Sequence, residues 1–125
     1  MKFLGIDYGS KRVGVAVSDE NGRIAFPHKV LFTDKTLVKE IKKICDEKMV
    51  EAIVLGQSLD YKGQPNPIQK EISNFEFRIS NLTKLPVHYQ SETLTSVEAA
   101  RSTNKSMLDA SAAALILQSY LDKAT

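Results

Sequence analysis

The sequence predicts an α/β fold in which a mixed five-stranded sheet is flanked by helices. The first third of the chain contains strand patterns in close succession, joined by short turns, which predicts an antiparallel meander. The remainder alternates helical patterns with short apolar runs, which predicts parallel strands connected by helices. A three-stranded meander followed by two parallel strands would form one mixed sheet.

The opening hairpin is the clearest strand pattern in the chain. A strand over residues 2–7 is followed by a glycine-containing turn and a strand over residues 12–18, in which Val13, Val15 and Val17 alternate. Alternating apolar residues on both sides of a tight turn predict a β-hairpin. Asn21-Gly22 marks the next turn, and the third strand is expected over 23–26, resuming at 29–32. Pro27 interrupts it and favours an edge position, because proline cannot donate a backbone hydrogen bond.

Two helices are predicted around a buried strand. The first should begin after a cap at Thr33 or Asp34, because the apolar residues that follow recur at helical spacing. The apolar run 52–55 predicts a strand buried on both faces, ended by Gly56. Turn-forming residues then predict a loop over 57–67. The second helix should bury a stripe made of Ile68, Ile72, Phe75, Ile79 and Leu82.

The last part of the chain predicts a fifth strand over 86–90, a short helix over 95–101 and a final helix from about Ser106 to Asp122. Both helix starts have a capping-box form, in which a Ser or Thr precedes an acid by three residues. The predicted order is three strands, a helix, a strand, a helix, a strand and two helices. This order is the ribonuclease-H-like topology, with helices on both faces of the sheet.

Composition limits the class of protein. A length of 125 residues is typical of a single domain, so we expect residues 1–125 to share one core. A net charge of +2 neither indicates nor excludes a nucleic-acid partner. Cys45 is the single cysteine and lies on an apolar helical face, which predicts a core residue and excludes a disulfide framework. Without a long apolar segment or a signal-peptide pattern, we expect a cytoplasmic protein that does not contact membranes.

Three acids are predicted to lie at element ends. Asp7 ends the first strand, Glu92 follows the fifth strand, and Asp109 begins the final helix. Ligands of α/β sheets bind at the carboxyl ends of parallel strands. Carboxylates converging there would bind Mg²⁺ or Mn²⁺, and a pair of such ions can hydrolyse a phosphodiester bond. Each acid also has an ordinary alternative: turn formation for Asp7, a solvated glutamate for Glu92 and favourable interaction with the helix dipole for Asp109.

Four segments resemble a known family. They are LGIDYGSKRVGVAVS (4–18), IVLG (53–56) with Gly63, ETLTSVEA (92–99) and DASAAALILQSYL (109–121). In order and in extent they resemble the YqgF family of RuvX-type Holliday junction resolvases, now regarded as pre-16S rRNA nucleases. The resemblance implies a ribonuclease-H-like nuclease dependent on Mg²⁺ or Mn²⁺, which matures the 5′ end of 16S rRNA. It places the catalytic and metal-binding carboxylates at Asp7, Glu92 and Asp109.

The chain also departs from the family pattern. Ser91-Glu92-Thr93 stands where the family usually has Asp-Glu-Arg, so the acid remains but a neighbouring acid and a base are missing. An arginine there could contact phosphate through two hydrogen bonds. Gly56-Gln57-Ser58 replaces a Gly-Leu/Phe-Pro motif, and the segment from Arg101 to Asp109 is shorter than usual. These departures keep open a catalytically weak RNA-binding protein of the same fold that acts in ribosome biogenesis.

The expected partners follow from charge and resemblance. Lys11 and Arg12 would lie beside Asp7, and Arg101 and Lys105 would lie on the approach to Asp109, where they could contact phosphates without reading sequence. Alternatively, each is an ordinary solvated charge. Tyr61 could stack on a base, whereas Tyr8 is expected to pack at the end of the sheet. We expect a monomer or weak homodimer that binds pre-16S rRNA, with branched DNA as the alternative substrate.

A further alternative is one half of an actin-like phosphotransferase. The sequence Asp7-Tyr8-Gly9 followed by a valine-rich strand also occurs in sugar-kinase folds. A length of 125 residues disfavours this interpretation, because two domains must close around ATP in such enzymes.

Overall fold

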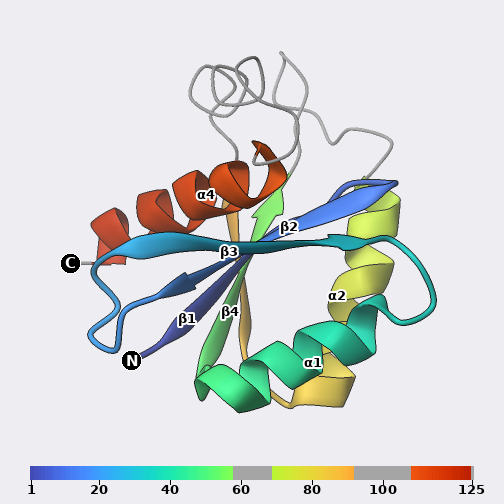
Figure 1. Cartoon of the computed structure of the whole chain (residues 1–125), viewed down its shortest axis with the longest axis horizontal. Helices are drawn as coiled ribbons and strands as arrows, with labels where there is room; N and C mark the ends of the chain where they lie inside the picture. Colours follow the sequence, from blue (N-terminus) through green and yellow to red (C-terminus); the bar gives the residue numbers. More distant parts are fainter. Residues whose placement is uncertain (58–68, 92–107, 125) are drawn as a thin grey trace.

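A computed structural model of the chain describes residues 1–57, 69–91 and 108–124. Its strands form one five-stranded sheet in the order β3-β2-β1-β4-β5 (Figure 1). The strands are β1 (Phe3–Asp7), β2 (Arg12–Ser18), β3 (Ala25–Phe32), β4 (Ala52–Gln57) and β5 (Val87–Ser91). The helices are α1 (Leu37–Lys48), α2 (Gln69–Thr83) and α4 (Leu108–Ala124).

The pairing of the strands confirms the predicted mixed sheet. β1 pairs antiparallel with β2, and β2 pairs antiparallel with β3. On its other side β1 pairs parallel with β4, which pairs parallel with β5. The predicted ribonuclease-H-like fold is therefore confirmed, with β1 at the centre of the sheet. The predicted loop over 57–67 falls almost entirely outside the described residues, as does the predicted short helix over 95–101.

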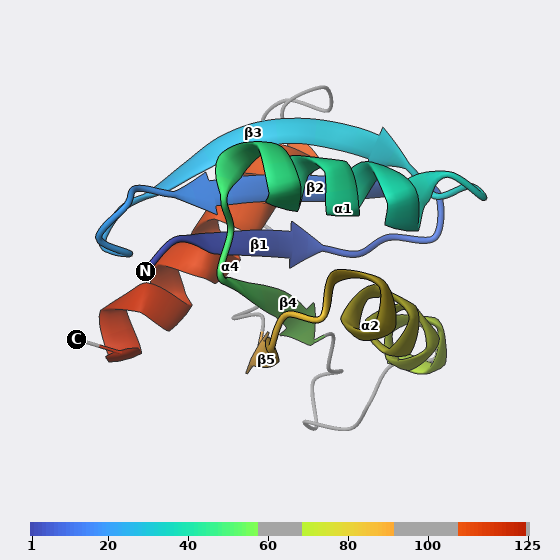
Figure 2. The same ribbon diagram turned by 90° about the horizontal axis from the view of Figure 1, so that it is seen from below.

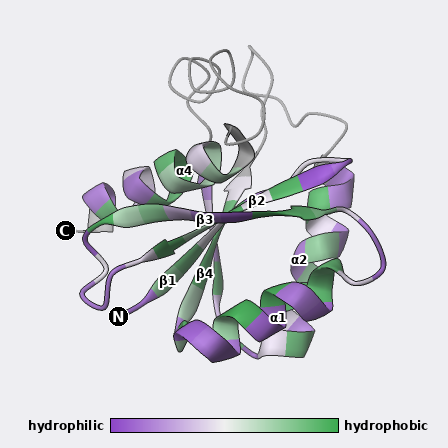
Figure 3. Ribbon diagram, in the orientation of Figure 1, coloured by the Kyte–Doolittle hydropathy of each residue, from purple (hydrophilic) through white to green (hydrophobic). Residues whose placement is uncertain are grey.

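Helices cover both faces of the sheet (Figure 2). Alternate side chains of β1 point to opposite faces and so contact different helices. Leu4 and Ile6 point into a core that also contains the buried residues of α1 and α2. Gly5 faces the opposite side, where α4 packs against the sheet through Ala113 and Leu117. Hydrophobic residues accordingly concentrate along the central strands, while the outer side of α1 is hydrophilic (Figure 3). Both faces of β4 are buried, as its continuous apolar run predicted.

The third strand differs from the prediction because Pro27 does not interrupt it. β3 runs without a break from Ala25 to Phe32, and Pro27 lies opposite Ala16 of β2. The register shifts between Val15 and Ala16, so an irregularity in the pairing takes up the disturbance. β3 is an edge strand, as the proline predicted, because the missing N–H needs no partner on the open side.

Several element bounds also correct the predictions. The N-cap of α1 is Thr36, and Asp34 instead accepts hydrogen bonds from the backbone N–H and the hydroxyl of Thr36, at 2.9 and 2.7 Å. β4 continues through Gly56 to Gln57, because it pairs with β5 as far as Ser91. Leu82 is 38% exposed, so the predicted apolar stripe of α2 ends one turn earlier, at the buried Ile79.

Candidate active site at the carboxyl edge of the sheet

Asp7 is buried at the end of the central strand. Asp7 is only 3% exposed, and every other buried residue of β1 is apolar or glycine. Asp7 lies opposite Gly14 of β2 and, by strand alternation, shares the α4 side of the sheet with Gly5. A carboxylate is costly to bury unless it is paired or holds a cation. Its burial therefore favours a specific role over that of a surface turn former.

The packing of α4 brings the start of this helix to the same edge. The ring of Phe3, at the start of β1, lies 5.8 Å from the ring of Tyr120 near the end of α4. Further along β1, a Cβ at Gly5 would lie 2.7 Å from Leu117 Cβ and 3.0 Å from the carbonyl oxygen of Ala113. The contacts thus move toward the beginning of α4 as β1 approaches Asp7. The helix and the strand run antiparallel.

The other two predicted acids are located only by the backbone. Asp109 is the second residue of α4, four residues before Ala113 and so about one helical turn nearer the helix start. Its side chain lies outside the described part of the structure. Glu92 follows Ser91, the last residue of β5, and lies outside the described residues altogether. Among the described side chains no cluster of three potential metal ligands occurs, so the predicted three-carboxylate site stays a prediction.

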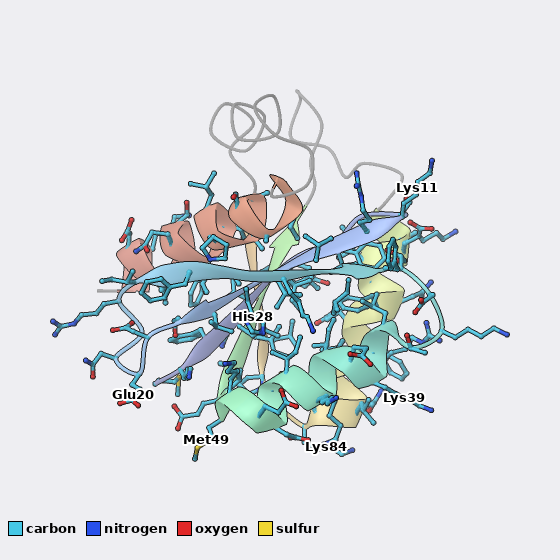
Figure 4. All side chains as sticks on the ribbon, viewed as in Figure 1. Lys11, Glu20, His28, Lys39, Met49 and Lys84 are labelled. Atoms are coloured by element: carbon cyan, nitrogen blue, oxygen red, sulfur yellow. The ribbon has the colours of Figure 1, made fainter. Side chains whose placement is uncertain are left out.

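Lys11 and Arg12 lie at the turn that follows Asp7. Both are exposed, and Lys11 projects from the end of the sheet in Figure 4. Arg12 is the first residue of β2, two residues before Gly14, so it is on the same face of the sheet as Asp7. The structure therefore brings this predicted cation pair to the edge where Asp7 lies. Arg101 and Lys105 lie outside the described residues.

Hydrogen bonds hold this turn in place. The backbone N–H of Thr33 donates to the carbonyl of Lys11 at 3.0 Å, and the Thr33 hydroxyl donates to the carbonyl of Gly9 at 2.7 Å. The hydroxyl of Ser10 donates to a carboxylate oxygen of Glu71 in α2 at 3.1 Å. A Cβ at Gly9 would lie 2.5 Å from the carbonyl oxygen of Arg12, so this close turn requires glycine.

The aromatic residues of this edge confirm the prediction for Tyr8 and add an exposed residue, Phe32. Tyr8 packs on Phe75 of α2 with ring centroids 5.0 Å apart, which confirms its expected place at the end of the sheet. Burial, aided by the nearby Glu71, raises the pKa of the Tyr8 hydroxyl. Tyr61 lies outside the described residues. Phe32 is instead the exposed aromatic residue here, 72% exposed and directly opposite Arg12.

Sequence reasoning missed Phe32, although a signal was present. Leu31 is buried in the structure, so period-2 alternation places Phe32 on the opposite face at the end of an edge strand. An apolar residue in that position has no neighbouring strand on its outer side. The alternation thus identifies the face of Phe32, but its exposure depends on how far α4 extends over β3.

A groove lies on the other side of the sheet. This groove of about 710 Å³ runs between α1 and α2, with Phe75 and Phe77 among its lining residues. Tyr8 also borders it, but its described lining includes neither Asp7 nor Arg12. The groove is therefore separate from the carboxylate edge.

The sheet order and the helices on both faces define a ribonuclease-H-like fold. The chain belongs to the RuvX family: a family model described as "RuvX: Holliday junction resolvase" matches residues 1–123. No helix in the described part of the chain is long and apolar enough to span a membrane.

Curated relatives agree with this assignment. A protein of Nitratidesulfovibrio vulgaris is 37% identical, with 98% of this chain and 94% of the relative covered. A protein of Oenococcus oeni is 36% identical, with 98% and 95% covered. Both carry the name "Putative pre-16S rRNA nuclease". The family model and these names correspond to the two substrates expected from the sequence.

Solved structures share the fold. Thermus thermophilus RuvC, solved in complex with a Holliday junction substrate, matches with a TM-score of 0.65 at 15% identity, covering 99% of this chain and 95% of RuvC. The Holliday junction resolvase of fowlpox virus matches with a TM-score of 0.59 at 13% identity, covering 98% and 99% of the two chains. At these identities the likeness concerns the fold alone.

Proposed function

We propose that this protein is a divalent-metal-dependent nuclease that hydrolyses phosphodiester bonds in RNA and matures the 5′ end of pre-16S rRNA. The observation that carries the proposal is the burial of Asp7 at the carboxyl end of the central strand, beside the start of α4. Membership of the RuvX family and the names of the curated relatives support it.

Asp7, Glu92 and Asp109 are the residues that would hold Mg²⁺ or Mn²⁺. Carboxylate oxygens are the ligands these hard cations prefer, so the donor set fits the metal. Glu92 follows Ser91, the last residue of β5, directly in the sequence. Asp109 is the second residue of α4, about one helical turn before Ala113, which contacts β1. When bound, such ions activate water and stabilise the leaving oxygen of the phosphodiester.

The chain itself would position the RNA. Lys11 and Arg12, both exposed, place positive charge at the edge of the sheet where Asp7 lies. Arg12 can bind a phosphate through two hydrogen bonds, whereas Lys11 acts as a point charge. The hydrogen bonds from Thr33 to the turn fix both cations relative to β1. The predicted contribution of Arg101 and Lys105 would add charge on the approach to Asp109.

The test is cleavage of a 5′-extended 16S precursor RNA with Mg²⁺ or Mn²⁺. Replacing Asp7 by Asn removes a metal-ligating charge at nearly constant shape, so we expect the cleavage rate to fall by about two orders of magnitude or more. The control is Asp46→Asn, because Asp46 is exposed on α1 and pairs with Lys42. No metal-dependent cleavage by the wild type would refute the proposal. Equal cleavage by wild type and Asp7→Asn would place the activity elsewhere.

Two alternatives are distinguished by the same assay. A catalytically weak RNA-binding protein would bind the precursor without cutting it, and Ser91→Asp combined with Thr93→Arg should then restore cleavage by restoring the family pattern. A resolvase would instead cut a four-way DNA junction in preference to the precursor RNA. The family model, described as a Holliday junction resolvase, is the reason to include the junction as a second substrate.

A further inference from the structure

Phe32 is held in an exposed position by its backbone. The residue is 72% exposed and ends β3, the edge strand. After it, the backbone N–H of Thr33 donates to the carbonyl of Lys11, and the N–H of Asp34 donates to the carbonyl of Phe32, both at 3.0 Å. The turn continues into α1 through a bond from Leu37 N–H to the Asp34 carbonyl at 3.2 Å. The aromatic ring is therefore presented to solvent from a fixed backbone.

The surroundings of Phe32 distinguish it from an isolated exposed apolar residue. It lies directly opposite Arg12 in the antiparallel pair, so the two side chains share one face of the sheet. That is the face of Asp7, which lies opposite Gly14, two residues along from Arg12. With ordinary strand spacing and rise, the Cα of Phe32 is about 12 Å from the Cα of Asp7. Because residue 14 is glycine, its position on β2 places no side chain between Phe32 and Asp7 on this face of the sheet.

We propose that Phe32 and Arg12 form a stacking platform for one unpaired nucleotide of the substrate, a short distance from the cleaved bond. A base stacks on the ring of Phe32 while Arg12 contacts the adjoining phosphate. Aromatic side chains stack with any base because every base has a π-face, and a neighbouring cation tracks the backbone. The inference rests on the proposed nuclease function and adds the substrate class, a single-stranded segment.

The requirement for an unpaired base follows from access. In a duplex both faces of each base are covered by their neighbours, so an exposed ring cannot stack on them without unwinding the helix. A single-stranded leader next to the cleavage position offers a base at no such cost. The platform should therefore favour single strands over duplexes of the same sequence, without reading that sequence.

The first measurement uses fluorescence in the absence of divalent metal, where no cleavage occurs. The chain contains no tryptophan, so Phe32→Trp introduces a single indole that retains the stacking surface and can be excited selectively over the four tyrosines. We expect a single-stranded RNA of about ten nucleotides to quench this fluorescence on binding, and the corresponding duplex to quench it much less. Single-stranded DNA of the same sequence tests whether the base alone is recognised. Quenching by the duplex to the same extent would overturn the proposal.

The matched control is Phe77→Trp. Phe77 is 71% exposed, almost as much as Phe32, but it lies on α2 and lines the groove between α1 and α2. Its fluorescence should not change when single-stranded RNA binds. Equal quenching at both positions would mean that single-stranded RNA does not bind specifically at Phe32.

The second measurement is affinity. Phe32→Ala should weaken binding of single-stranded RNA by about 5- to 150-fold and leave duplex binding unchanged, because one base loses its stacking partner. An unchanged affinity would refute the platform. If the wild type shows no metal-dependent cleavage but Phe32→Trp is quenched, the proposed function fails and the platform stands. If the wild type cleaves RNA but Phe32→Trp is not quenched, the platform fails and the proposed function stands.

Discussion

Asp7 and Cys45 are both 3% exposed, yet their burial has opposite chemical meanings. The carboxylate of Asp7 ends a strand at the edge of the sheet, where a cation could reach it. The thiol of Cys45 lies on the apolar face of α1, and desolvation raises its pKa to about 11. An uncharged thiol is a good core residue, and a charged carboxylate is not.

We predict that Cys45 is inert in the folded protein. The thiolate is the reactive form, and a pKa of about 11 leaves very little of it at pH 8. DTNB at pH 8 should therefore label about one thiol per chain after denaturation and almost none in the native state. Rapid labelling of the native protein would contradict the burial of this side chain.

The sequence was sufficient to single out Asp7 as a candidate site residue, but not to predict that Phe32 is exposed. An acid inside an apolar strand is unusual in any fold, so its importance could be inferred from its immediate neighbours. The exposure of Phe32 is a tertiary property, because it depends on how far α4 covers the edge strand. Leu82 was assigned to the core for the same reason: helical spacing fixes a face but not how far along the helix that face is covered.

At the scale of elements, α4 depends on the absence of a side chain in β1. Gly5 lies against this helix, and a Cβ there would be 2.7 Å from Leu117 Cβ and 3.0 Å from a backbone oxygen. The small residues of α4, among them Ala112 and Ala113, complete the close approach. The hairpin and its bounds were predictable because alternation and turn residues are local signals. The continuity of β3 through Pro27 was not, because it depends on the shift in pairing register between Val15 and Ala16 of β2, which no local signal in the sequence indicates.

We predict that Gly5→Ala destabilises the protein by about 1–3 kcal/mol, because neither a backbone oxygen nor a Cβ can move aside cheaply. The midpoint of urea unfolding measures the change. Because α4 would shift at its contact with β1, metal-dependent cleavage should also decrease. An unchanged midpoint would show that α4 does not pack closely at Gly5.

At the scale of the whole molecule, the position of the positive charges matters more than the small net charge. The net charge is only +2, but Lys11 and Arg12 are both exposed at the edge beside Asp7. Such placement gives a local positive field where the overall balance gives almost none. The lysines of α1 differ in this respect, since Lys42 pairs with Asp46 at 2.8 Å on an outer face.

Replacing Lys11 and Arg12 together by Ala should flatten the salt dependence of RNA binding. Each phosphate contact contributes about 0.7 to the slope of log affinity against log salt for single strands, so the slope should decrease by about 1.4. The control, Lys39→Ala with Lys43→Ala, removes the same charge from exposed positions on α1. It should leave the slope nearly unchanged. A similar decrease in both variants would mean that only net charge matters.

The antiparallel packing of α4 on β1 also has a consequence for the order in which the edge beside Asp7 is assembled during folding. β1, β2 and β3 are joined by short turns, whereas β1 and α4 are separated by most of the chain. Contacts between such distant segments carry the larger loop-closure entropy and form late in folding. The meander can therefore exist while the edge beside Asp7 still lacks the helix that carries Asp109. With Asp7 and Asp109 as the proposed metal ligands, a partly folded chain should not cut RNA, since these two acids come together only after α4 has packed on β1.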